Sequence, residues 1–380
     1  MKTLLAAGVR PNFVKAAPIM EALRRAGGEA RLVHTGQHAD DGRSGAFFRD
    51  LGMAEPDIWL AAGGDGEARS PARRMGRIMA AFEEIVRAER PDWVIVLGDV
   101  DSTLACGLAA ARIRWETGVR VAHVEAGLRC GDLDMPEEVN RRLTDHLSDL
   151  LLAPDVGAAR NLAGEGIEPG RIDMAGNVMV DTLLSRLDRA RERDAPGRFG
   201  ARPGGYAVAT LHRQANVDDP AMLAALLDGL GAVAGLLPVL VPLHPRTRER
   251  IAAFGLEERL APLGTLPPLG YLDMLSLSDG AGLVLTDSGG LQEETTVLGV
   301  PCVTLRPSTE RPVTISEGTN RLIPWPPERE GIAACAAWAL GEGRLPVGSR
   351  APAGWDGATS GSRLPAPRAR RPGRQGHGEN

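Results

Sequence analysis

Cysteine is scarce in this sequence, and the few cysteines are widely scattered. The four of them, Cys106, Cys130, Cys302 and Cys335, include no Cys-x-x-Cys pair. Such spacing is typical of reduced thiols in a cytoplasmic protein, and it argues against a disulfide framework or a zinc site. We therefore expect no metal site.

An excess of positive charge and long apolar runs are also missing. The formal net charge is −5, which argues against a nucleic-acid partner held by a basic surface. No apolar run approaches the roughly 20 residues that a membrane-spanning helix needs. The chain enters a strand-like run, 3–7, almost at its start, so we expect no signal peptide. The sequence thus predicts a cytoplasmic protein without a membrane partner.

What the sequence does have is a regular alternation of strand and helix patterns. Its 380 residues, 43% of them hydrophobic, are enough for two domains with cores of their own. The alternation occupies two blocks, 1–177 and 206–341, and predicts an α/β protein with two Rossmann-like, doubly wound domains facing each other across a cleft. Residues 178–205 are interpreted as a crossing helix and a linker. Residues 342–380 are interpreted as a disordered or aberrant tail, because 351–380 are rich in Gly, Pro, Ser and Arg and cannot bury enough surface.

Two successive strand patterns in the first block end in an acid. The apolar run 93–97 leads to Asp99, and the run 119–124 leads to Glu125. Strands buried on both faces place such acids at the carboxyl edge of the sheet, where crevices form. Either acid alone is compatible with capping the next helix. Two on neighbouring strands favour a catalytic pair, because close carboxylates push their pKa values apart and can divide acid and base roles.

Charged residues follow other elements of this block. Arg10 lies in the predicted turn after the first strand, and Lys15 lies in the first turn of a helix predicted over 13–26. A cation is poorly placed at a helix N-terminus because the dipole is already positive there, so the two residues are either an anion site or solvated charges. Further on, Glu137 and Arg141 share one face of a helix that Pro136 opens, a spacing that is usual for a surface ion pair.

The second block is organised around residues 282–301. A buried strand, 283–286, is followed by the turn Ser288-Gly289-Gly290 and a helix over 291–298. The helix start offers free N–H groups and a partial positive charge, which suit a phosphate. Glu293 and Glu294 in the first turn suit the same helix end, and Glu294 is also placed to reach a ribose hydroxyl. An ordinary turn capped by Ser288 remains the alternative.

Other strands of the second block end in basic residues. His212 follows the strand 206–210, His244 follows the strand 238–243, and Arg311 lies in the loop after the strand 301–305. A histidine alone is more often a core or capping residue than a catalyst. The place of His212 at a strand end beside Arg213 favours a role in a site.

Several of these segments, in this order, resemble the non-hydrolysing UDP-N-acetylglucosamine 2-epimerases, over roughly residues 1–323. One such motif would be weak, whereas the ordered set is highly specific. The set comprises Gly8-Val9-Arg10-Pro11 with Lys15, GDVDST at 98–103, HVEAGLR at 123–129, MPEEVNR at 135–141, LHR at 211–213, PLHPRTR at 242–248, TDSGGLQEE at 286–294 and TERP at 309–312.

The resemblance implies a glycosyltransferase-B type of fold that closes on a nucleotide sugar. It implies reversible conversion of UDP-N-acetylglucosamine to UDP-N-acetylmannosamine through loss of UDP, a bound 2-acetamidoglucal and re-addition of UDP, with neither a nicotinamide nor a metal. The catalytic residues that it implies are Asp99, Glu125, Glu137, Arg141 and His212. The substrate-binding residues that it implies are Arg10, Lys15, His244, Met274, Ser288, Gly289, Gly290, Glu294 and Arg311.

The resemblance also leaves alternatives and carries further expectations. A 2-epimerase for a related sugar such as a diacetamido uronate, a hydrolysing relative, a glycosyltransferase on the same fold and a non-catalytic UDP-sugar binder are the alternatives. A homodimer is a family expectation, and Gln37 and His38 lie in the loop that contributes to an activating site in bacterial relatives. The sequence departs from the family at Met274, where an aromatic residue is common, and at 358–380, which do not continue the family's C-terminal helix.

Overall fold

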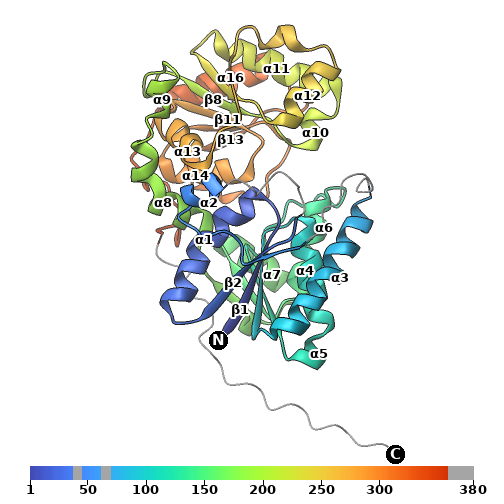
Figure 1. Cartoon of the computed structure of the whole chain (residues 1–380). Helices are drawn as coiled ribbons and strands as arrows, with labels where there is room; N and C mark the ends of the chain where they lie inside the picture. Colours follow the sequence, from blue (N-terminus) through green and yellow to red (C-terminus); the bar gives the residue numbers. More distant parts are fainter. Residues whose placement is uncertain (37–44, 61–69, 358–380) are drawn as a thin grey trace, which may run out of the picture.

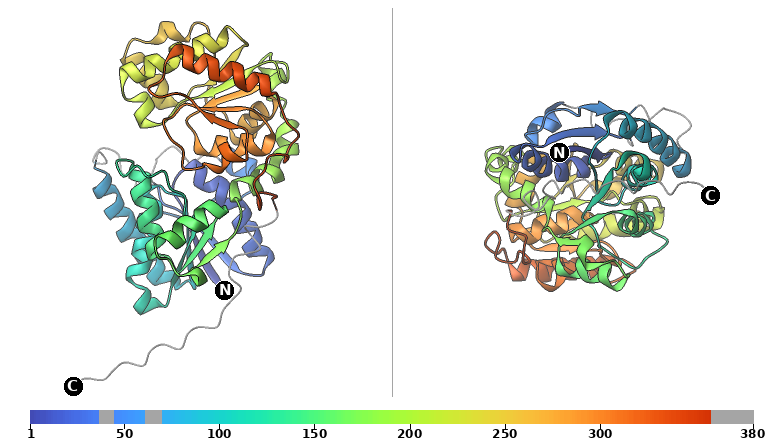
Figure 2. Two further views of the ribbon diagram at one scale, coloured as in Figure 1. Left: turned by 180° about the vertical axis from the view of Figure 1, so that it is seen from behind. Right: turned by 90° about the horizontal axis from the view of Figure 1, so that it is seen from below.

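The structure is a computed structural model that describes residues 1–36, 45–60 and 70–357. Two lobes are stacked one above the other, and each is built around a parallel sheet with helices packed on it (Figure 1). The first lobe contains the N-terminus and the second contains α16 (Arg329–Glu342), which lies across it in the view from behind (Figure 2). The predicted α/β class, with two Rossmann-like sheets, is confirmed.

The sheet of the first lobe has seven strands in the order β3-β2-β1-β4-β5-β6-β7, all parallel. The winding direction reverses between β1 and β4, and ligands of such folds bind outside the carboxyl ends of strands at this kind of switch point. The strands are β1 (Lys2–Ala7), β2 (Glu29–His34), β3 (Ile58–Trp59), β4 (Trp93–Leu97), β5 (Arg120–Val124), β6 (Leu150–Ala153) and β7 (Ile172–Met174).

The sheet of the second lobe has six strands in the order β10-β9-β8-β11-β12-β13, again all parallel. Its reversal lies between β8 and β11, so the second lobe has a switch point of its own. The strands are β8 (Ala207–Thr210), β9 (Val239–Pro242), β10 (Gly264–Leu266), β11 (Leu283–Thr286), β12 (Cys302–Thr304) and β13 (Asn320–Leu322).

Helices connect the strands of each lobe. Those of the first lobe are α1 (Arg10–Arg25), α2 (Gly45–Asp50), α3 (Pro71–Glu89), α4 (Asp101–Arg112), α5 (Arg114–Thr117), α6 (Pro136–Leu147) and α7 (Val156–Gly164). Those that follow are α8 (Val178–Arg191), α9 (Ala195–Arg198), α10 (Gln214–Val217), α11 (Pro220–Ala234), α12 (Pro245–Ala253), α13 (Tyr271–Gly280), α14 (Gly289–Leu298), α15 (Val313–Ser316) and α16. Short 3-10 turns occur at η1 (Pro169–Arg171) and η2 (Glu257–Leu260).

Alternate residues of the central strands enter different cores. In β1, Leu5 packs with the cluster around Phe13 on one face, while Leu4 packs with the cluster around Phe82 on the other. Both faces of the sheet are therefore covered. This explains why the strands read as continuous apolar runs, without alternation of polar and apolar residues.

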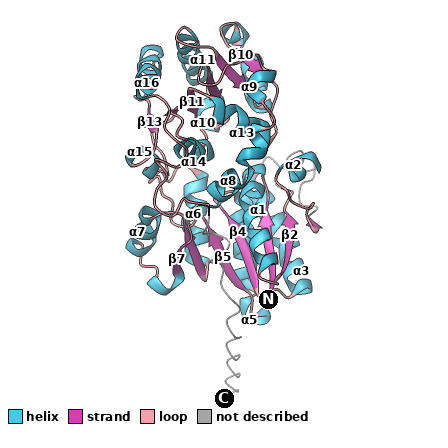
Figure 3. Ribbon diagram, turned by 90° about the vertical axis from the view of Figure 1, so that its left-hand side faces the viewer, coloured by secondary structure: helices cyan, strands magenta, loops and turns pink. Residues whose placement is uncertain are grey.

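Helix α8 lies at the junction of the two lobes (Figure 3). It packs against α1 of the first lobe and against α13 and α14 of the second. The Thr182 hydroxyl donates a hydrogen bond to the Val14 carbonyl at 2.6 Å. The segment interpreted as crossing helix and linker contains α8 and α9, and the domain limits at 177 and 205 stay a prediction.

The segment after α16 is ordered further than the sequence indicates. Trp355 is 2% exposed, and its indole Nε1–H donates to the Pro154 carbonyl of the first lobe at 3.1 Å. The expectation that the tail begins at 342 is therefore corrected, because a lone aromatic residue in a polar stretch finds a buried place between the lobes. The remaining expectations for 358–380 and for Gln37 and His38 lie outside the described residues.

None of the helices in the described part of the chain combines the length and the apolar character needed to cross a lipid bilayer.

Candidate functional site

The predicted acids of the first lobe lie at the carboxyl ends of β4 and β5, beside buried cations. Asp99 accepts a hydrogen bond from Arg141, with its Oδ2 2.9 Å from the Arg141 Nε. Burial opposes ionisation of Asp99, but the positive charges of Arg141, Lys15 and Arg311 outweigh it and lower the pKa of Asp99. Asp99 is therefore a carboxylate. Its side chain is 26% exposed, so a ligand can reach it.

Glu125 occupies a strained backbone position at the end of β5. Its φ of 66° lies in the left-handed region, which costs a non-glycine residue roughly 1–3 kcal/mol and is tolerated chiefly at functional sites. Its buried carboxylate forms an ion pair with Lys15, and the other oxygen lies 3.9 Å from Arg311 of the second lobe. Glu125 thus joins a cation from each lobe.

The two basic residues near the first strand have different surroundings. Helix α1 begins at Arg10, because Pro11 suits a first helical turn. The expected turn at Arg10 is therefore wrong, and Lys15 lies in the second turn of the helix. Lys15 is buried against Glu125, whereas Arg10 is exposed and lies over the Phe47 ring, 5.6 Å from its centroid.

Two adjacent glutamates of α6 behave differently. Glu138 is fully buried, forms an ion pair with Arg141, and accepts the Cys130 N–H at 3.1 Å. Glu137 is partly exposed and has no hydrogen-bond or ion-pair partner among the described residues. The surface ion pair that the spacing of Glu137 and Arg141 permits is not formed, because the guanidinium of Arg141 turns inward to Glu138 and Asp99.

In the second lobe, the Ser288-Gly289-Gly290 turn starts α14. Ser288 caps the helix, its hydroxyl accepting the Leu291 N–H at 3.5 Å. Gly289 leaves no room for a side chain, because a Cβ there would collide with Arg311 and lie 2.8 Å from the Glu310 Oε1. Arg311 therefore lies against the N-terminus of α14 on one side and faces Glu125 on the other.

Helix α14 also carries two buried acids with raised pKa values. Burial raises the pKa of Glu293 to about 7, with Arg311 opposing the shift and Glu125 adding to it. Burial, then the neighbouring charge of Glu293, raises the pKa of Glu294 to about 8. Glu293 Oε1 lies 2.8 Å from Arg311 Nε. Glu293 was placed at this helix end from the sequence but was given no role in the site, although its spacing of four from Gly289 places both on one helix face.

Glu310 is a second buried acid at this position that was given no role from the sequence. Its buried carboxylate receives Arg306 at 2.8 Å and Arg213 at 3.3 Å, and it also pairs with Arg311. Burial opposes ionisation, but the arginines prevail and hold the pKa of Glu310 well below its usual range. Its place within the TERP motif at 309–312 could have indicated a role in the site.

The two histidines lie at strand ends of the second lobe. His212 is 41% exposed, and its Nδ1 lies 2.8 Å from Asp287. Despite burial, His212 and two backbone N–H groups lower the pKa of Asp287 to about 2. His244 caps α12, its Nδ1 accepting the Arg246 N–H at 3.3 Å, and its ring centroid lies 6.4 Å from that of His212. Met274, on α13, is partly buried against the adjoining core.

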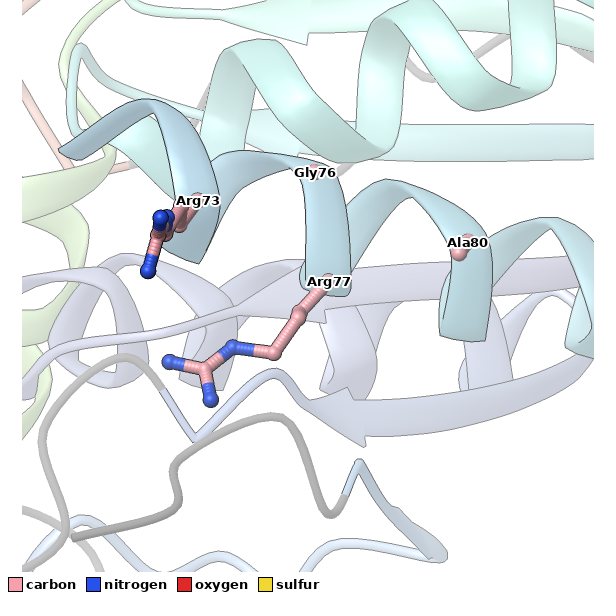
Figure 4. Close-up of a pocket in the computed structure, with 4 residues that line it drawn as sticks. All are labelled: Arg73, Gly76, Arg77 and Ala80. Atoms are coloured by element: carbon pink, nitrogen blue, oxygen red, sulfur yellow. The ribbon is translucent and has the colours of Figure 1, made fainter. Parts of the chain in front are cut away.

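The described residues contain no cluster of three or more His, Cys, Asp or Glu residues that could hold a metal ion. A cavity of about 460 Å³ is lined by Arg73, Gly76, Arg77 and Ala80 (Figure 4). All four belong to α3, and none is a predicted site residue.

Comparisons with known proteins agree on one family. The model of the UDP-N-acetylglucosamine 2-epimerase family matches residues 21–360. The chain is 37% identical over 333 residues to the UDP-N-acetylglucosamine 2-epimerase of Methanocaldococcus jannaschii, covering 85% of this chain and 88% of that one. It is 39% identical over 346 residues to the UDP-2,3-diacetamido-2,3-dideoxy-D-glucuronate 2-epimerase of Pseudomonas aeruginosa. The match covers 90% of this chain and 93% of that one. The crystal structure of the M. jannaschii enzyme in complex with UDP-GlcNAc and UDP superposes with a TM-score of 0.85 at 35% identity, covering 96% of this chain and 98% of that one.

Proposed function

The chain belongs to the UDP-N-acetylglucosamine 2-epimerase family, and we propose that it interconverts UDP-N-acetylglucosamine and UDP-N-acetylmannosamine. The observation that carries the proposal is the position of Arg311. Its guanidinium lies 3.9 Å from Glu125, and the same side chain borders Gly289 at the start of α14. A sugar diphosphate bound at α14 would therefore meet carboxylates of the first lobe, as elimination of UDP requires.

The proposed reaction has two steps. In the first, a carboxylate takes the C2 proton while the C1–O bond breaks, its electron pair leaves with UDP, and a C1–C2 double bond forms the 2-acetamidoglucal. In the second, UDP adds back to C1 and an acid delivers a proton to the opposite face of C2. Such a path needs a base on one face of the sugar and an acid on the other.

Asp99, Glu125 and Glu137 are the proposed acid and base groups, with Arg141 and His212 completing the catalytic set. Arg141 supports this arrangement by lowering the pKa of Asp99, although burial opposes the shift. Because neighbouring acids titrate as a coupled set, the proposal assigns the proton transfers to the three carboxylates together.

The leaving diphosphate is proposed to bind at the N-terminus of α14. Ser288, Gly289 and Gly290 offer backbone donors there, and a helix N-terminus stabilises the charge that develops on the phosphates. Arg311 adds a guanidinium that can bind phosphate in a bidentate manner. The remaining proposed contacts are Glu294 to the ribose, Met274 near the base, and Arg10, Lys15, His212 and His244 around the phosphates and sugar.

The test is incubation of the purified protein with UDP-N-acetylglucosamine in deuterated water, followed by NMR and mass spectrometry. Deuterium at C2 of both epimers is the expected result, because the proton removed exchanges with solvent before re-addition. UDP accumulating without epimer would instead indicate hydrolysis. Tight UDP binding without turnover would indicate a non-catalytic binder.

A second candidate substrate is a UDP-diacetamido uronic acid. The observation in its favour is the 39% identity to the P. aeruginosa enzyme named for that sugar. Parallel assays of both UDP-sugars, ranked by kcat/KM, separate the two candidates. We also propose a homodimer, as the family resemblance implies, which light scattering after size-exclusion chromatography would test.

A further inference from the structure

Two fully buried ionisable residues of the first lobe have no part in the proposed reaction. His123 lies in β5 and Asp145 lies in α6, and both are 0% exposed. The His123 Nδ1 is 2.7 Å from the Asp145 Oδ1. Burying such a pair is costly, and apolar residues of similar volume are often as stable. Stability alone therefore does not explain why this pair is buried here.

The His123 ring spans from Asp145 to the turn that carries Asp99. Its Nε2 lies 2.8 Å from the carbonyl oxygen of Gly98. A carbonyl oxygen can only accept a hydrogen bond, so the His123 Nε2 donates to Gly98, and one proton lies between Nδ1 and the Asp145 carboxylate. Gly98 has a φ of 64°, and its carbonyl belongs to the peptide group that it shares with Asp99. The imidazole thus holds the peptide that leads into Asp99.

The second oxygen of Asp145 holds the turn that carries Glu125. Oδ2 accepts the Gly127 N–H at 3.1 Å and also lies 2.7 Å from the Arg129 Nη2. Gly127 has a φ of 86°, and a Cβ there would collide with the carbonyl of Ala158. Only glycine fits this close approach, so the backbone two residues after Glu125 packs directly against the Ala158 carbonyl of α7.

The two turns are also connected to each other. The Gly98 N–H donates to the Val124 carbonyl at 3.0 Å. Gly98 and Glu125 both have left-handed backbones, and Glu125 keeps a costly conformation only if its surroundings hold it there. Asp145 provides such support to both turns, to one through His123 and to the other directly.

We propose that His123 and Asp145 are positioning residues that align Asp99 with Glu125 by holding the Gly98 carbonyl and the Gly127 amide. The inference rests on the proposed function, in which those two carboxylates react. Neither residue touches substrate. They act through the backbone of the two turns, and a displacement of about 1 Å in a reacting group can lower turnover roughly 100-fold.

The test compares two substitutions that each keep one half of the imidazole. His123→Gln places an amide N–H near the former Nε2 and can retain the bond to Gly98. His123→Asn places it near the former Nδ1 and retains only the bond to Asp145. We expect His123→Asn to lower kcat by about 100-fold, and His123→Gln by about threefold to tenfold. KM should stay within about threefold in both, because the diphosphate site is untouched.

Asp149→Ala is the matched control. Asp149 accepts the Val121 N–H at 2.9 Å and pairs with Arg114 at 3.0 Å, at the opposite end of the same strand. It should lose stability without loss of kcat. Asp145→Ala removes both connections and, if it folds, should lower kcat by at least as much as His123→Asn.

The outcomes separate this inference from the proposed function. A wild-type protein that gives no exchange at C2 overturns the function, and the inference with it. A wild-type protein that exchanges, together with equal kcat values for His123→Gln and His123→Asn, overturns the inference alone. The inference is also overturned if the loss of kcat follows the loss in free energy of unfolding in urea across all variants, Asp149→Ala included. His123 and Asp145 would then have only a structural role.

Discussion

The guanidinium of Arg311, in the loop after β12, lies 3.9 Å from the carboxylate of Glu125 at the end of β5. One residue belongs to each lobe, and both side chains are at least nine-tenths buried. Glu125 also pairs with Lys15, and Arg311 also pairs with Glu293. Buried positive and negative side chains of the two lobes therefore pair with one another at this junction.

Asp99→Asn should abolish turnover and leave UDP affinity within about a factor of ten, or ~1.4 kcal/mol. Asparagine keeps the shape and an acceptor for Arg141, but it cannot take a proton in the reaction. Isothermal titration with UDP and the deuterium-exchange assay measure the two quantities. Equal loss of binding and turnover would make Asp99 a structural residue.

Substitutions of the two adjacent glutamates of α6 should have different effects on stability and on kcat. Glu137→Gln should leave the free energy of unfolding within about 0.5 kcal/mol, because the side chain has no partner among the described residues. It should lower kcat by roughly 10²–10⁴-fold if Glu137 transfers a proton.

Glu138→Gln is the matched comparison. Neutralising this fully buried partner of Arg141 should cost about 3 kcal/mol in urea unfolding. If Glu137→Gln unfolds more easily than Glu138→Gln, the surroundings described for the two residues are wrong.

Glu294 should make stability depend on pH. Its pKa rises on folding from 4.5 to about 8, through burial and then the charge of Glu293. The folded state thus binds the proton more tightly, and this contribution to stability is complete below pH 4.5 and lost as the pH rises through 8. Glu294→Gln cannot ionise, so it should gain about 5 kcal/mol relative to wild type over that range.

Urea unfolding at a series of pH values measures the difference, with Glu258→Gln on the exposed turn η2 as the control. A difference between Glu294→Gln and wild type that stays constant with pH would contradict the raised pKa.

Trp355→Ala should lower the free energy of unfolding by about 3–5 kcal/mol, the usual cost of removing a large buried aromatic side chain. Trp355→Phe keeps most of the packing and loses only the hydrogen bond to Pro154, so it should cost about 1 kcal/mol. If Trp355→Ala is as stable as wild type, the segment after α16 does not join the lobes in solution.

Much of the architecture could be predicted from local pattern. Apolar runs followed by small or acidic residues located β4, β5 and β11, and the carboxyl ends of parallel strands share one edge of a sheet. Asp99 and Glu125 were placed at the carboxyl edge of the sheet for this reason, and the structure has them there. The start of α1 was misplaced by three residues, because Pro11 was interpreted as part of a turn although it also suits a first helical turn.

The sequence by itself determined the two parallel sheets and the strand ends that carry charge, because backbone pairing and apolar periodicity are local properties. Only the tertiary structure decided which of Glu137 and Glu138 faces Arg141, and that Glu293 lies beside Arg311. It also decided that Asp145 reaches both turns through His123 and Gly127. Those contacts depend on how helices rotate and lobes meet, and that is set by packing over the whole chain.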